Sequence, residues 1–335
     1  MNSTHRDIQL DIYRALTMIY IVCVIHTMYW FDYSLEPLKS LLLFEMPMMF
    51  FISGAAYSMQ TQRKKIFNII ASRVRRIVLP FYIFLFVLFF LLIFGFFEAN
   101  IYSFSKHEII KLIATGGSNK LPYYGYTWFI SVYLIVTCSL PIQQRIMERT
   151  RRYVYILMCL SPCIVISFVT FPIADWFIKE LFVYNFFFVL GYLYYRNISN
   201  KLLLFILIIT LFIVIYGFID GIMIPMQDNK FPPNIYFLIF SLSALCIISI
   251  LFGKIKFRNN YLLRLWNKRG YTIYLYQCVS HYIVFLITKN WIISIHSETA
   301  VFIIYFIITL CVATILSYFT YPFERLLIKV FQNIS

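Results

Sequence analysis

The chain has 335 residues, of which 61% are hydrophobic and only 13% are charged, and its mean hydropathy is +0.79. A soluble protein of this length cannot cover its surface with so few charged side chains, so the composition excludes a soluble globular domain. The formal net charge of +15 does not call for a nucleic acid partner. An excess of Lys and Arg on the cytoplasmic side of a membrane protein, attracted to anionic lipid headgroups, accounts for it.

Ten apolar segments follow one another along the chain, with lengths that suit helices crossing a bilayer. We place them at 11–31, 38–60, 77–98, 126–142, 153–171, 178–195, 201–220, 234–253, 271–288 and 299–320. Each is continuously apolar rather than alternating, which favours helices over the strands of a membrane barrel. The predicted fold class is an all-α integral membrane protein, a bundle of about ten transmembrane helices.

The charges between these segments predict how the bundle is oriented. Lys and Arg are concentrated between the second and third, the fourth and fifth, and the eighth and ninth segments. In a ten-helix topology these three connections lie on one side of the membrane. Because positive loops stay in the cytoplasm, we expect both termini to be cytoplasmic.

The seven cysteines lie in or beside apolar segments, and none forms a Cys-x-x-Cys pair. This pattern is typical of cysteines that act as small buried hydrophobic residues. We therefore expect neither a metal site nor a disulfide framework.

The first apolar segment contains two ionisable residues, Arg14 near its start and His26 near its end. Such residues are costly inside a membrane helix and usually mark a functional site. Histidine suits general-base catalysis because its pKa lies near neutral pH, and arginine presents a planar fork of donors to phosphate or carboxylate. Alternatively, His26 is a helix-end residue bonded to a neighbour, and Arg14 reaches the headgroups or pairs with Asp11 or Glu45.

Glu45 lies a few residues into the second segment, where a carboxylate must be paired or protonated. It is a candidate to orient His26, as the acid of a hydrolase triad orients the imidazole, or to bind hydroxyl groups of an acceptor. Pro47 follows closely and predicts a kink in this helix.

Three arginines, Arg73, Arg75 and Arg76, precede the third segment. They are ordinary positive-inside residues by default, but they also suit an anion site for phosphates.

Aromatic and polar residues occur at the ends of other segments. Trp128 begins the fourth segment, where it belongs either to the interfacial aromatic belt or to a surface that stacks on a sugar ring. We expect the outer segment 230–234 to shape an acceptor entrance. Glu324, beyond the tenth segment, is expected to pair with Arg325 or with a basic loop.

Several of these features occur in a recognisable order. They are an Asp-x-x-Arg start at Asp11 with a histidine late in the first segment, the run MPMMFFISG at 46–54, RVRRIVLP at 73–80, WFIS at 128–131 and YTIYL at 271–275. In this order they resemble the membrane-bound acyltransferase family 3, whose members O-acetylate cell-envelope polysaccharides and related glycans. The resemblance covers about residues 8 to 325.

The resemblance implies one transmembrane acyltransferase domain over residues 1–335, in a bacterial cytoplasmic membrane. The donor implied is cytoplasmic acetyl-CoA, used as a substrate and without a metal, and the acceptor is a hydroxyl of an envelope polysaccharide or lipid-linked glycan. His26 and Glu45 would be catalytic, with His26 as the general base. Arg14, Arg73, Arg75 and Arg76 would bind the donor, and Trp128, Tyr274 and Gln277 the acceptor.

The chain departs from the family pattern in two places. The spacing between Arg14 and His26 is one residue longer than usual, which on a straight α-helix rotates the two side chains about 120° apart. Either the first helix contains a π-bulge or a kink, or the two residues act from different faces. Gln277 stands where the family often has a histidine, and His281 lies one turn further on.

A transporter or flippase of a glycan or acyl intermediate is the alternative function, because buried Arg and His also mark transport paths. Transporters often consist of inverted repeats, and the sequence contains no repeat that we recognise. This favours the enzyme.

Overall fold

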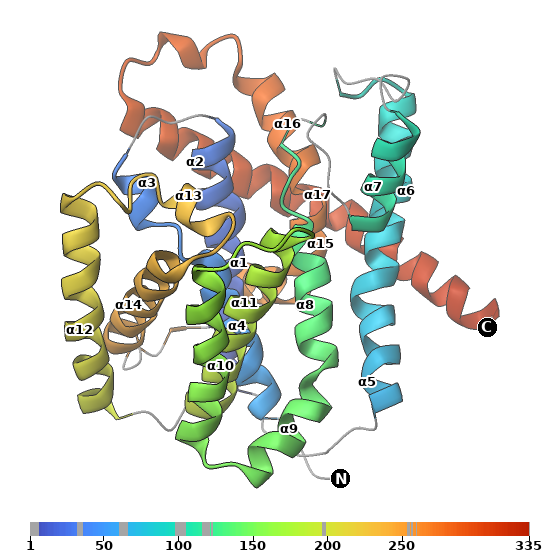
Figure 1. Cartoon of the computed structure of the whole chain (residues 1–335). Coiled ribbons are helices and arrows are strands. Elements are labelled where there is room, and N and C mark those ends of the chain that lie inside the picture. The colour runs from blue at the N-terminus through green and yellow to red at the C-terminus, as the bar shows by residue number, and fades with distance from the viewer. Residues whose placement is uncertain are drawn as a thin grey trace. The chain divides into compact units, whose positions relative to one another are not determined.

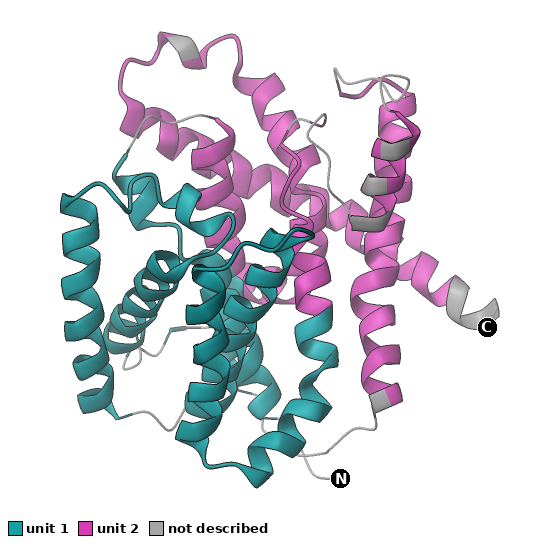
Figure 2. Cartoon of the chain, in the orientation of Figure 1, with its two compact units in different colours: residues 1–17, 34–64, 135–260 teal, residues 18–33, 65–134, 261–335 magenta. Residues whose placement is uncertain are grey.

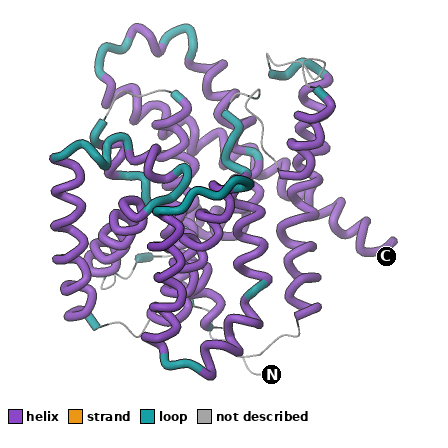
Figure 3. Tube along the Cα trace, in the orientation of Figure 1, coloured by secondary structure: helices purple, strands orange, loops and turns teal. Residues whose placement is uncertain are grey.

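The protein is described from a computed structural model of the whole chain. The described residues are 7–31, 36–59, 66–97, 105–115, 121, 123–195, 199–252, 255, 257–258 and 260–334. Parts of the predicted basic loops, at 60–65, 253–254, 256 and 259, lie outside these ranges. Within them the chain consists of helices and loops, with no strand, as Figure 3 shows. The all-α prediction is therefore confirmed.

The chain divides into two compact units, each assembled from three separate stretches (Figure 2). Unit 1 comprises residues 1–17, 34–64 and 135–260, and unit 2 comprises residues 18–33, 65–134 and 261–335. The stretches of the two units alternate along the chain, so neither unit is an N-terminal or C-terminal half. The single domain over residues 1–335 stays a prediction.

The helices of unit 1 are labelled in Figure 1. They are most of α1 (Ile8–Ile19), α3 (Leu38–Leu41), α4 (Glu45–Ser58), α9 (Leu140–Arg149), α10 (Arg152–Ser167), α11 (Asp175–Tyr194), α12 (Asn200–Ile219), α13 (Met226–Lys230) and α14 (Ile235–Phe252). Large apolar side chains remain exposed on α12, where Phe212 is 77% and Ile219 is 82% exposed. Exposing such an apolar surface to water is unfavourable in free energy, whereas contact with lipid tails is not.

Two glycines allow α4 and α11 to pack with their backbones in close contact. A Cβ atom at Gly54 would overlap the carbonyl oxygen of Phe188, and one at Gly191 would overlap the carbonyl oxygen of Phe51. Small residues at such crossings let membrane helices approach closely. Phe50 and Tyr184 stack beside this crossing, with ring centroids 5.0 Å apart.

We expect Gly54→Ala to destabilise unit 1 by about 1–3 kcal/mol, because the added methyl group meets backbone that cannot rotate away. Thermal unfolding of the purified protein in detergent measures this loss. Gly217→Ala is the control, since its Cβ would meet only the flexible side chain of Met223. Equal unfolding midpoints for the two variants would contradict the proposed close packing.

Unit 2 contains the rest of the first helix and the C-terminal helices. Its elements are the π-helix η1 (Tyr20–Ile25), α2 (His26–Trp30), α5 (Ile66–Arg73), the π-helix η2 (Val74–Val78), α6 (Leu79–Ile93), α7 (Lys106–Thr115), α8 (Trp128–Cys138, partly in unit 1), α15 (Tyr261–Leu275), α16 (Gln277–Thr288), the 3₁₀-helix η4 (Ile292–Ser294) and α17 (Glu298–Ile334). Hydrogen bonds join α15 to α17, for example from Trp266 Nε1 to Thr314 Oγ1 at 3.0 Å.

Seven described helices are long and apolar enough to cross a membrane, and α8 with α9 forms an eighth candidate that is bent by 45°. Two shorter apolar helices, α10 and α16, lie at two further predicted positions. The chain is thus an integral membrane protein, with a helix at each predicted segment. The number ten and the cytoplasmic termini stay predictions.

Three local predictions differ from the structure. Pro47 does not kink its helix, because α4 begins only at Glu45 and the proline occupies the first turn, where its missing N–H is not needed. The arginines before the third segment are not in a loop, since α5, η2 and α6 follow one another without a break. The ninth segment consists of two helices, α15 and α16, that meet at Tyr276.

Candidate functional site

The first helix contains a π-helix, η1, immediately before His26. A π-turn accommodates one additional residue and changes the register of everything that follows it. This is the π-bulge that the spacing between Arg14 and His26 predicted as one of two possibilities. The additional residue of this chain is therefore absorbed by the local helix geometry.

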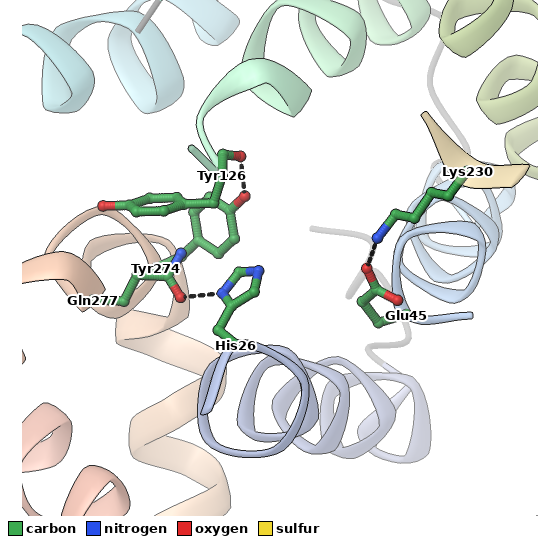
Figure 4. A network of polar contacts seen from close by, with 6 residues as sticks. All are labelled: His26, Glu45, Tyr126, Lys230, Tyr274 and Gln277. Carbon is green, nitrogen blue, oxygen red and sulfur yellow. Dashed lines mark hydrogen bonds and ion pairs between the residues drawn. The ribbon is translucent and has the colours of Figure 1, made fainter. Parts of the chain in front are cut away.

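The imidazole of His26 is bonded to the side chain of Gln277 in unit 2. Nδ1 lies 2.6 Å from Gln277 Oε1, as Figure 4 shows. An amide oxygen only accepts hydrogen bonds, so Nδ1 carries the proton. In the neutral ring the basic lone pair is then on Nε2, the atom from which a general base acts.

Aromatic rings surround His26. Trp30 stacks on the imidazole at a centroid distance of 4.6 Å, and the rings of Tyr126 and Tyr274 lie at 5.9 Å and 6.3 Å. The two tyrosines hold each other in place: Tyr126 Oη donates to the carbonyl oxygen of Leu275, and Tyr274 Oη donates to that of Tyr126, each at 2.5 Å. The surroundings of the imidazole are thus largely apolar and fixed.

His281 supports this arrangement from one turn further along α16. Its fully buried ring donates from Nδ1 to the carbonyl oxygen of Gln277 at 2.8 Å and accepts at Nε2 from Thr27 Oγ1 at 3.3 Å. Trp30 packs edge-on against the same ring, with centroids 4.6 Å apart. Since Thr27 follows His26 in the chain, His281 ties the backbone of Gln277 to the helix that carries the imidazole.

Unit 1 contains a buried ion pair between Glu45 and Lys230 (Figure 4). Glu45 is 1% exposed and Lys230 is 4% exposed. The lysine ends α13, which Ser40 holds in place by accepting a hydrogen bond from the backbone N–H of Met226 at 2.9 Å. Segment 230–234 was predicted to face an acceptor entrance, but its first side chain points into the protein. The predicted contact of Glu45 with His26 stays a prediction.

A second carboxyl group, Glu180 on α11, was not considered from the sequence. Its side chain is fully buried, lies within electrostatic range of Lys230, and has no hydrogen-bond partner among the described residues. The preceding Lys179 pairs instead with Asp175 at 3.0 Å. An acid inside the apolar segment 178–195 was the signal that could have identified it.

The other predicted residues are distributed over both units. Arg14 forms an ion pair with Asp11 at 3.6 Å, as one alternative anticipated. Arg73 ends α5, while Arg75 and Arg76 are exposed on η2. Trp128 begins α8 and is half-buried.

Glu324 follows the predicted tenth segment but still lies within α17. It is 5% exposed, accepts a hydrogen bond from Thr272 Oγ1 at 2.8 Å, and lies within electrostatic range of Arg325, its expected partner. The tenth helix extends past the apolar segment, and this carries the carboxylate against α15 and away from solvent.

Comparison with known protein families gives one result. A family model described as an acyltransferase domain matches residues 7–318, which include His26, Gln277, Glu45 and Lys230 but not Glu324. Searches of curated proteins and of solved structures gave no match.

Proposed function

The chain belongs to acyltransferase family 3, and we propose that it transfers an acetyl group from acetyl-CoA to a hydroxyl of a cell-envelope glycan. His26 is the general base of this proposal. The observation that carries it is the hydrogen bond from His26 Nδ1 to Gln277 Oε1, because it leaves Nε2 ready to accept a proton.

The reaction follows from this tautomer. Nε2 takes the proton of the acceptor hydroxyl while the hydroxyl oxygen forms a bond to the thioester carbonyl carbon. The tetrahedral intermediate then expels the sulfur, and the thiolate takes up the proton held by His26. Acceptor ester and free thiol are the products, and no additional reactant is consumed. The apolar rings around His26 keep water away from the intermediate.

The donor side of the proposal involves the arginines. Arg14, Arg73, Arg75 and Arg76 suit the phosphates of cytoplasmic acetyl-CoA in charge and geometry. Trp128, Tyr274 and Gln277 remain the proposed contacts of the acceptor, and Glu45 is the second proposed catalytic residue, after His26. The proposed location is the cytoplasmic membrane of a bacterium, where donor and envelope precursor are both present.

Binding and transfer assays on the purified protein in detergent test the proposal. We expect calorimetry to detect acetyl-CoA binding to the wild type, and Arg14→Ala to weaken it. Incubation with acetyl-labelled acetyl-CoA and a crude envelope glycan fraction should give labelled, alkali-labile ester. Absence of binding at millimolar acetyl-CoA would contradict the donor assignment and reopen the transporter alternative.

Gln277 is a positioning residue in this mechanism. We expect Gln277→Leu to lower kcat about ten- to a hundredfold, because the protonated Nδ1 loses its acceptor. Gln277→Glu keeps an oxygen that accepts from Nδ1, so it should retain more of the wild-type kcat than Gln277→Leu. A purely structural role of Gln277 would not produce this rescue.

A further inference from the structure

We propose that unit 2 contains a donor track, made of Arg269, Arg325, Tyr276 and Gln277, that binds acetyl-CoA from its phosphates to its thioester. The inference rests on the proposed function and extends it to residues of α15, α16 and α17. It assigns the Nε2 donor of Gln277 to the thioester, and this replaces the contact of Gln277 with the acceptor in the proposed function.

The track begins at two arginines that share one tyrosine. The guanidinium carbons of Arg269 and Arg325 lie 5.5 Å and 5.9 Å from the ring centroid of Tyr321, and Arg269 also lies 4.2 Å from that of Tyr318. Arg325 is exposed and Arg269 is half-buried. Both guanidinium groups thus lie near one aromatic ring, where the oxygens of a bound phosphate accept from both.

A line of polar groups leads from these arginines along α15. Thr272, one turn beyond Arg269, donates to the buried Glu324 and so holds α15 against α17. Tyr276 lies a further turn on, in electrostatic contact with Glu324. The spacing of Arg269, Thr272 and Tyr276 places them on one face of the helix.

The track ends at two buried donors on successive residues. Tyr276 is 3% exposed and Gln277 is fully buried, yet Tyr276 Oη and Gln277 Nε2 have no hydrogen-bond partner among the described residues. Buried polar groups nearly always have a partner, so each exception needs an explanation. Two such exceptions on successive residues, one of them bonded to His26 through its other amide atom, indicate a ligand that supplies hydrogen-bond acceptors.

Acetyl-CoA has matching groups in the matching order: phosphates at one end, amide carbonyls along the pantetheine arm, and the thioester at the other end. The rise from Arg269 to Gln277 is about 12 Å, a distance that an extended pantetheine arm covers. Tyr276 Oη then donates to an arm amide. Gln277 Nε2 donates to the thioester carbonyl oxygen, where negative charge develops as the acceptor oxygen adds.

Three acetyl donors of decreasing size test the track. Acetyl-CoA contains nucleotide and arm, S-acetylpantetheine lacks the nucleotide, and S-acetyl-2-mercaptoethanol lacks both the nucleotide and the arm amides. We expect Arg269→Gln to raise KM about tenfold for acetyl-CoA alone. Tyr276→Phe should raise KM about three- to tenfold for the two larger donors and leave the smallest unchanged. Tyr282→Phe, six residues further on in α16 and packed against Phe97, is the matched control.

The outcomes separate the two proposals. If the wild type transfers acetyl from none of the three donors, the proposed function fails and the track with it. If the wild type is active but Tyr276→Phe affects all donors equally, or none, only the track is wrong. If Arg269→Gln leaves KM for acetyl-CoA unchanged and instead alters the response to phosphatidylglycerol in nanodiscs, the arginine pair binds lipid headgroups, and the nucleotide end of the track is refuted.

Discussion

Replacement of His26 by alanine should abolish acetyl transfer while leaving acetyl-CoA binding intact. Removing a general base typically slows a reaction about 10²- to 10⁴-fold, because the hydroxyl must then lose its proton to water. The rate of labelled ester formation, measured at saturating acetyl-CoA, gives kcat directly. Calorimetry on the same preparation shows whether the donor still binds.

His281→Gln is the informative control for this variant. His281 is the other histidine of the site, but both of its ring nitrogens already have partners in the fold. We therefore expect a lower unfolding temperature and a modest loss of kcat. If His281→Gln lost as much activity as His26→Ala, the general base would be His281 and not His26.

Lys230→Met should be strongly destabilising. Removing one partner of a buried ion pair leaves an uncompensated charge, at a cost of about 3–5 kcal/mol. Here the residual charge is that of Glu45, which is 1% exposed, and Glu180 is nearby. Thermal unfolding of the purified protein in detergent measures the loss.

Two further variants make this prediction specific. The double variant Glu45→Gln/Lys230→Met removes both charges and should recover much of the stability, because neutral replacements of a buried pair are often tolerated. Lys179→Met breaks the more exposed pair with Asp175, whose carboxyl side chain is 23% exposed, and should cost far less. If Lys230→Met and Lys179→Met unfold at the same temperature, burial does not make the Glu45–Lys230 ion pair more important for stability than the Asp175–Lys179 pair.

The sequence predicted those parts of the fold that depend on composition along the chain. Apolar segments of bilayer length gave the helices, because no other structure satisfies the backbone within lipid. The helix ends were less predictable. Arginines have good helix propensity, so the chain continues as helix through Arg73 and Arg76 where a loop was expected.

For the site, too, some features could be predicted from the sequence and others could not. The cost of an ionisable group in a membrane helix singled out His26 and Glu45 as candidates, and the spacing between Arg14 and His26 gave a π-bulge as one of two possibilities, which the π-helix confirms. The partners of these residues could not be predicted, because they depend on which distant segments pack together. Gln277 lies 251 positions from His26, and Lys230 lies 185 positions from Glu45. No local pattern encodes such pairings.

The π-helix at Tyr20–Ile25 also bears on how this chain should be aligned with its family. A π-turn arises when one residue is inserted into an α-helix whose two flanks are each held by their own contacts. When this chain is aligned with relatives of shorter spacing, the residue that faces a gap therefore belongs within 20–25. It does not belong at the helix ends, where alignment gaps are usually placed. Relatives with the shorter spacing would then be plain α-helices at this point, and the two forms would differ by a single codon insertion or deletion.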